Sequence, residues 1–143
     1  MMQEHLVFRF EVDGEDFTSA GQASVQVKKN LRQLGIDPET IRRVSIAMYE
    51  GEINMVVHAG GGIAEVGVFD EYIEIVLDDH GPGIADIGKA MQEGYSTADE
   101  RVRELGFGEG MGLPNMKRYT DDMKITTEIG KGTVVDMTVL VNQ

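Results

Sequence analysis

Several polar residues in this sequence stand at spacings that suit ligand chemistry. Glu50 and Asn54 are four residues apart in a segment with helical periodicity, so their side chains fall on one face of a helix. An amide oxygen is a hard ligand suited to Mg²⁺, and a carboxylate beside it can act as a general base. The competing interpretation is an ordinary polar face turned to solvent, because that face also carries Ala47, Gly51 and His58.

Two glycine-rich loops supply the other candidates. Asp79-His80-Gly81-Pro82-Gly83 follows an apolar run, and the carboxylate of Asp79 could accept a hydrogen bond from an exocyclic amine such as that of adenine. The run Gly108-x-Gly110-x-Gly112 opens a segment with helical spacing, which places backbone N–H groups where phosphates could dock. The competing interpretation of each glycine is a simple turn.

Two familiar phosphate-binding motifs are excluded. Residues 83–89 have the glycine and lysine spacing of a P-loop, but Ala90 stands where the motif needs a hydroxyl, and no strand immediately precedes the run. Neither glycine pair fits the dinucleotide-binding fingerprint, because Met111 and Asp86 occupy the positions of its third glycine.

The composition limits the class of protein and of partner. A chain of 143 residues fits a single domain, 1–143, with one core. Acidic residues outnumber basic ones 25 to 13, which argues against nucleic acid or an anionic membrane as partner. The absence of cysteine excludes disulfides, zinc–thiolate sites and cysteine nucleophiles. With neither a signal-peptide pattern nor an apolar run of about 20 residues, we expect a cytoplasmic protein.

Periodicity indicates the elements that must position these residues. Alternating or apolar runs predict strands over 5–12, 63–69, 72–77, 123–128 and 133–141, and helical spacing predicts helices over 19–34, 39–59, 85–93 and 111–119. Gly35 and the glycines 60–62 are expected to end helices, and Asp37-Pro38 to begin one. Residues 94–112, rich in glycine, small polar residues and charges, are predicted to form a mobile lid over a ligand.

The order of these elements indicates an α+β fold. No βαβ repeat recurs at regular spacing, which argues against a doubly wound sheet. We expect a two-layer α/β sandwich, in which a mixed, mainly antiparallel sheet carries its helices on one face. In the long helix, Ile41, Val44, Met48 and Met55 form the apolar stripe that should face the core.

In this order, the motifs resemble those of the GHKL ATP-binding superfamily, which has the Bergerat fold. The helix with Glu50 and Asn54 resembles the N-box, and the loops at Asp79 and before Gly112 resemble the two glycine boxes. Residues 130–133 resemble the closing G-x-G-T turn. The likeness extends roughly from residue 41 to the C-terminus.

Two further segments, 86–97 and 112–118, resemble a branch of that superfamily, the bacterial anti-sigma-factor serine/threonine kinases, and in particular its stress-response switch kinases. The short chain resembles the same branch. The charged insert from Ala98 to Leu105 is longer than expected for a switch kinase, and the N-terminal 40 residues carry no family motif.

The resemblance implies ATP and Mg²⁺ as cofactors and assigns roles to the site residues. Asn54 would bind Mg²⁺, and Glu50 would orient or deprotonate the attacking hydroxyl. Asp79 would read adenine, supported by Thr133, directly or through water. The glycines of the first box, Gly81 and Gly83, would allow close approach to the base and ribose.

The second glycine box would wrap the phosphates, with Gly108, Gly110, Met111, Gly112 and Leu113 as binding residues. Further candidates for phosphate contact are Ser96, Thr97, Arg101 and Arg103. Lys117 is either a phosphate-side cation or a charge at the C-terminal end of a helix.

Such kinases phosphorylate a STAS-domain antagonist, and several also bind a sigma factor or other regulator; a homodimer is compatible with the resemblance. The alternative is a nucleotide-gated module that binds a regulator with little or no phosphoryl transfer. A sensor histidine kinase is a third reading. It is disfavoured because no helical segment with a phospho-acceptor histidine precedes the domain, and His5 falls in a predicted strand.

Overall fold

The computed structural model describes residues 6–14, 20–81, 83–84, 91 and 112–141. The elements, in chain order, are β1 (Leu6–Asp13), α1 (Gln22–Gln33), α2 (Pro38–Ala59), β2 (Gly61–Val68), β3 (Tyr72–Asp79), α5 (Gly112–Arg118), β4 (Asp122–Glu128) and β5 (Gly132–Leu140). The helix predicted over 85–93 and the lid predicted over 94–112 lie outside the described residues, apart from Met91 and Gly112.

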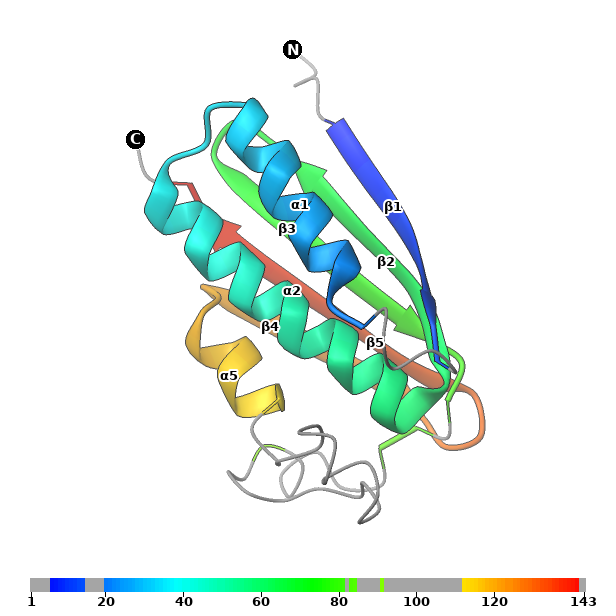
Figure 1. Ribbon diagram of the computed structural model, residues 1–143. Coiled ribbons are helices and arrows are strands. Elements are labelled where there is room, and N and C mark those ends of the chain that lie inside the picture. The colour runs from blue at the N-terminus through cyan, green and yellow to red at the C-terminus, as the bar shows by residue number, and fades with distance from the viewer. Residues whose placement is uncertain (1–5, 15–19, 82, 85–90, 92–111, 142–143) are drawn as a thin grey trace.

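The five strands form one sheet in the order β1-β2-β3-β5-β4. Helices α1, α2 and α5 all lie on one face of it, with α2 running along the middle of the helical layer (Figure 1). The predicted two-layer α+β fold is therefore confirmed. All four pairings among the described strands are antiparallel, so this part of the sheet is more regular than the mixed sheet that we expected.

Local residues set the turn between α1 and α2, as the sequence predicted. Gly35 has a φ of 78°, and the N–H of Ile36 donates to the carbonyl of Leu31, which closes α1 with a Schellman turn. The carboxylate of Asp37 accepts a hydrogen bond from the N–H of Thr40 at 3.0 Å and caps α2. The turn between the two helices is thus held by contacts between residues close in the sequence.

The glycine run after α2 behaves differently from the prediction. Only Gly60, with a φ of 72°, ends the helix, whereas Gly61 and Gly62 already belong to β2. A Cβ at Gly62 would overlap the carbonyl oxygen of Asp78, so glycine here allows β2 to lie close against β3. The run therefore joins helix to strand without an intervening loop.

Other predicted boundaries shift by a few residues. Helix α1 begins at Gln22, whereas the prediction began at Ser19, which lies outside the described residues. Strand β3 continues to Asp79 rather than ending at Leu77, and β5 begins at Gly132. Asp79 is thus held in the sheet, which restricts its side chain more than a loop would.

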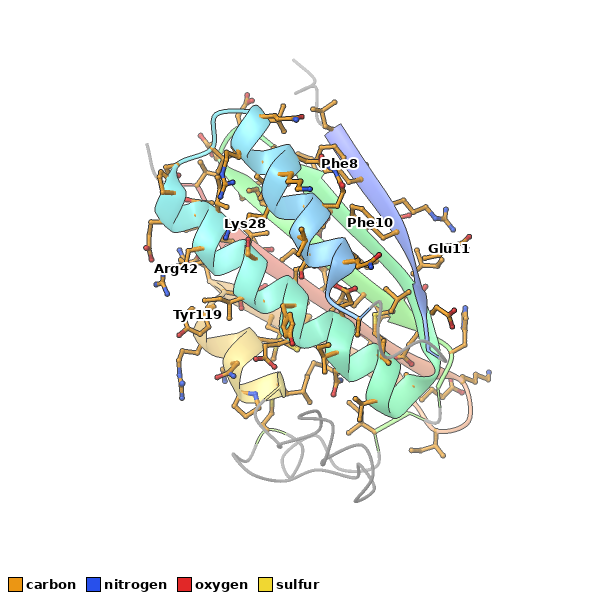
Figure 2. The ribbon with its side chains drawn as sticks, in the orientation of Figure 1. Phe8, Phe10, Glu11, Lys28, Arg42 and Tyr119 are labelled. Carbon is orange, nitrogen blue, oxygen red and sulfur yellow. The ribbon has the colours of Figure 1, made fainter. Side chains whose placement is uncertain are left out.

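The core lies between the helices and the inner face of the sheet. Every residue of the predicted α2 stripe is buried, namely Ile41, Val44, Met48 and Met55. Helix α1 contributes Val27 and Leu31, which are both 0% exposed. Figure 2 shows Phe8 and Phe10 on the side of β1 that faces α1, whereas Glu11 points away from it. The alternation predicted for this strand is therefore confirmed.

A buried carboxylate joins the two long helices. Glu52 of α2 is 3% exposed, and its oxygens accept hydrogen bonds from the N–H groups of Gly21, Ala23 and Ser24 at 2.9 to 3.1 Å. These N–H groups lie at the beginning of α1, where a helix leaves its donors unpaired and favours a negative charge. This role of Glu52 was not predicted from the sequence.

The beginning of α2 is tied to the C-terminal part of the chain. The guanidinium of Arg43 pairs with the carboxylate of Asp121 at 2.8 Å, and that carboxylate also accepts the N–H of Leu140 at 2.7 Å. Arg42 lies over the ring of Tyr119, 5.5 Å from its centroid (Figure 2).

In the described residues, no helix is long and apolar enough to cross a membrane.

The open face of the sheet carries an acidic pair whose protonation affects stability. Burial raises the pKa of Glu74, as do the hydrogen bond and the negative charge of Asp136 on β5. A raised pKa in the folded state means that the protonated form favours folding, so stability falls as pH rises through that pKa.

Glu74→Gln should therefore raise the melting temperature at pH 7 by about 1–4 °C, because the repulsion across the strands is removed. Thermal melts followed by circular dichroism at several pH values would measure it. The gain should vanish below the ordinary glutamate pKa of 4.5, where Glu74 is itself protonated. A gain that persists at low pH would contradict the electrostatic cause.

Candidate functional site

A hollow at the C-terminal end of α2 gathers residues that are far apart in the sequence. Among the described residues, three polar side chains line it, from α2, β3 and β5: Asn54, Asp79 and Thr133. The other lining residues are Gly51, Met55, Ala59, Leu77, Gly83, Ile84, Met116 and Val135. An apolar surface with a few convergent polar groups is the usual composition of a small-molecule site.

Asp79 is held at the edge of the hollow by two backbone groups. Its Oδ1 accepts hydrogen bonds from the N–H of Gly81 and the N–H of Thr133, both at 3.0 Å. Within the described residues, its Oδ2 has no hydrogen-bond partner. The contact with Thr133 is therefore direct and made by the backbone, and Oδ2 is the oxygen left to accept from a ligand.

A second layer of polar contacts, not predicted from the sequence, lies behind Asp79. The hydroxyl of Thr127 accepts the N–H of Ile84 at 2.8 Å and lies 2.9 Å from the hydroxyl of Thr133. The Thr127 hydroxyl also lies 3.4 Å from the carbonyl oxygen of Gly132, to which it can donate, so either hydroxyl can be the donor in the contact between Thr127 and Thr133. The sequence signal for Thr127 was its position in β4, where it lies on the same face of the strand as Met123 and Ile125.

The glycines of the first box have a structural reason to be glycine. A Cβ at Gly81 would lie 2.7 Å from the Cα of Ala59, at the end of α2. At Gly83, where φ is 83°, a Cβ would lie 2.7 Å from the carbonyl oxygen of Glu128. Chain packing alone thus requires both glycines, and their closeness to a base and ribose stays a prediction.

The beginning of α5 adjoins the two candidate residues of α2. A Cβ built at Gly112 would lie 3.8 Å from Oδ1 of Asn54 and 4.0 Å from Oε2 of Glu50. One turn further along α5, the Nδ2 of Asn115 donates to Oε1 of Glu50 at 3.3 Å. Asn115 was not among the predicted site residues, although it lies three residues after Gly112 on the same helix.

The face of α2 that carries these residues is not a solvent face. Gly51 is buried, and a Cβ there would overlap the side chain of Leu77 and lie 3.4 Å from Met116. Ala47 is 0% exposed. The competing interpretation of this face as an ordinary polar surface is therefore wrong, since it packs against β3 and α5 and borders the hollow.

Several predicted contact residues are not brought to the hollow as side chains. Leu113 is 6% exposed and belongs to the core, so only its backbone can face a ligand. Lys117 is exposed in the last turn of α5, which favours the helix-end interpretation. The candidates that lie outside the described residues are Ser96, Thr97, Arg101, Arg103, Gly108, Gly110 and Met111.

The sequence matches the histidine kinase-like ATPase domain over residues 15–139. The chain belongs to this family. It is 31% identical to the serine/threonine-protein kinase RsbT of Bacillus subtilis, covering 79% of this chain and 83% of that one. It is 36% identical to the anti-sigma F factor of Caldanaerobacter subterraneus, covering 72% and 73%. The superfamily expected from the motifs is thereby confirmed.

Solved structures agree on the fold. The RsbU and RsbW domains of a Mycobacterium tuberculosis protein superimpose with a TM-score of 0.66 at 16% identity, covering 96% of this chain and 33% of that one. The mycobacterial sensor histidine kinase MprB gives 0.53 at 14% identity, covering 99% of both chains. This chain thus spans about a third of the first polypeptide. At these identities the likeness shows the fold alone.

Proposed function

We propose that the chain binds ATP in the hollow and transfers its terminal phosphoryl group to a serine or threonine of a STAS-domain protein. The observation that carries the proposal is the meeting of two candidate subsites at α2. Asp79 and Thr133 lie at one side of the hollow, and Asn54 lines it beside Glu50 and the beginning of α5. The two relatives named as a kinase and as an anti-sigma factor favour this class of reaction.

The polar groups at the edge of the hollow suit adenine. Oδ2 of Asp79 can accept from the exocyclic amine, while the hydroxyl of Thr133 can donate to a neighbouring ring nitrogen. Guanine has a carbonyl in place of that amine, so it would face a carboxylate with no proton between them. The apolar residues Met55, Leu77 and Met116 offer surface for the flat ring.

Asn54 is the proposed protein ligand of magnesium. Its amide oxygen is a hard ligand, it lines the hollow, and a carboxylate oxygen of Glu50 lies near the same point at the start of α5. Mg²⁺ bound there would neutralise charge on the phosphates. Few protein ligands are needed, since this ion usually keeps several waters and binds substrate phosphates.

Glu50 is the proposed base. As the hydroxyl oxygen of the protein substrate bonds to the terminal phosphorus, the bond from that phosphorus to ADP breaks, and Glu50 takes the hydroxyl proton. Asn115 fixes the carboxylate by donating to Oε1. The other oxygen, Oε2, lies nearer the beginning of α5, where the phosphates are expected.

The direct test is incubation with ATP, magnesium and a STAS-domain protein encoded beside the gene. Phosphoserine or phosphothreonine in that protein, located by mass spectrometry, is the expected product. ATP binding without any phosphorylated product would support the alternative instead, a nucleotide-gated module that binds a regulator. An absence of ATP binding would contradict both.

Asn54→Ala should weaken ATP binding in the presence of magnesium by about tenfold to a hundredfold, because a metal ligand is lost. Isothermal titration with and without magnesium would measure the change, which should nearly disappear without the ion. Asn30→Ala, the same substitution on α1, is the matched control and should leave affinity unchanged. Equal loss with and without magnesium would show that Asn54 acts on the nucleotide itself.

A further inference from the structure

Helix α1 carries a basic surface that contrasts with the rest of this acidic chain. Residues 17–36 contain no Asp or Glu, although acids outnumber bases 25 to 13 overall. Lys28, Lys29 and Arg32 are all exposed on α1, and among the described residues none of them forms an ion pair. Among the described residues, the carboxylate that contacts the beginning of this helix is that of Glu52, which is buried and adds little to the surface charge.

An apolar group lies beside these cations. Val25 is 55% exposed and falls on the same helix face as Lys28, Lys29 and Arg32, at i, i+3, i+4 and i+7. The ring of Tyr49 is 41% exposed and adjoins Gly21, one turn before Val25. We call Val25, Lys28, Lys29, Arg32 and Tyr49 the α1 surface.

The α1 surface is separate from the hollow and from the other basic residues of the helical layer. None of its residues lines the hollow. Arg42 and Arg43, at the beginning of α2, are neutralised by Glu39 and Asp121. Lys28 lies on the α2 side of α1 (Figure 2). Among the described helices, three exposed cations without an ion pair therefore lie together on α1, whereas Lys117 of α5 stands apart from them.

We propose that the α1 surface binds an acidic segment of a partner protein, one that covers Val25 and Tyr49 with an apolar residue of its own. Exposed tyrosine and arginine around an apolar centre are typical of protein interfaces. Opposite charge would guide the partner to this helix and away from the acidic remainder of the molecule. Three cations on a chain of net charge −12 are too few for a nucleic acid backbone or an anionic membrane.

The test uses a fluorescent peptide of about sixteen residues, roughly four helical turns. Every fourth residue of the peptide is leucine, and glutamates fill the positions between the leucines. Its binding is followed by fluorescence anisotropy on the full chain. The triple variant Lys28→Glu, Lys29→Glu, Arg32→Glu should weaken binding by about tenfold or more, since three exposed ion pairs become three repulsions. The triple glutamine variant should lie between it and the wild type.

A control of equal charge change separates this surface from net charge. Arg9→Glu, Lys124→Glu and Lys131→Glu together alter three cations of the sheet side, and this variant should retain most of the affinity. Val25→Ser should weaken binding through the apolar contact alone. Thermal melts confirm that each variant is folded.

Three outcomes would overturn the proposal. One is equal loss of affinity in the α1 triple variant and in the sheet-side control. Another is equally tight binding of a peptide in which glutamine replaces every glutamate. The third is tighter binding of a DNA duplex or of phosphatidylserine vesicles than of the acidic peptide, because a phosphate-bearing partner would then be favoured.

Discussion

Asp79→Asn is expected to weaken ATP binding by about a hundredfold while leaving the fold intact, because a charge-assisted hydrogen bond to the base is lost. The structure also fixes how the new amide must lie. Two N–H groups, from Gly81 and Thr133, converge on Oδ1, so the amide oxygen must take that position. The NH₂ group then points into the hollow, where a donor would meet the donor of adenine.

This forced orientation makes the prediction specific. ITP has a carbonyl in place of the adenine amine, so Asp79→Asn should lose ATP affinity far more than ITP affinity. Competition against a fluorescent nucleotide would measure both. Asp78→Asn, on the outer face of the same strand, is the matched control and should change neither. Unchanged ATP affinity in Asp79→Asn would contradict the proposed role of this carboxylate in binding adenine.

Glu50→Gln is expected to lower the rate of phosphoryl transfer by about a hundredfold to ten-thousandfold, the range typical of a lost general base. The amide oxygen of glutamine can still accept from Asn115, so the local geometry is preserved. ATP affinity should therefore change little. Single-turnover transfer to the STAS-domain substrate, measured beside nucleotide affinity, separates the two effects.

Glu52→Gln is the informative comparison on the same helix. Its carboxylate accepts three N–H groups at the beginning of α1, so we expect a loss of about 1–3 kcal/mol in the free energy of unfolding. Transfer per folded molecule should be unchanged. If Glu50→Gln instead lowers stability and spares the rate, its carboxylate is structural and the base must be sought elsewhere.

Local signals predicted much of the fold. Asp37 and Gly35 act within a few residues of their own position, and the α2 stripe follows from helical spacing alone. The role of Glu52 could not be predicted, because its partners at the start of α1 lie about thirty residues earlier in the chain. An acidic residue inside an apolar stripe signals burial, but it does not name the partner.

In the candidate site, too, residues with local sequence signals were predicted and residues that depend on long-range packing were not. Asn54 and Asp79 were found because their neighbours form motifs, and the structure brings both to one hollow. Asn115 and Thr127 were missed, since their importance depends on which helix and strand pack behind the site. Gly81 was expected to face a ligand, yet the contact that requires glycine there is with Ala59.

The hydrogen bond between Asp79 and Thr133 also makes the candidate site depend on a strand far along the chain. The two residues are 54 positions apart, and the second lies in β5, the last strand among the described residues. A nascent chain that ends before β5 already contains Asn54 and Asp79, but not the backbone group that holds the carboxylate in place. The pocket is consequently incomplete until β5 has paired with β3.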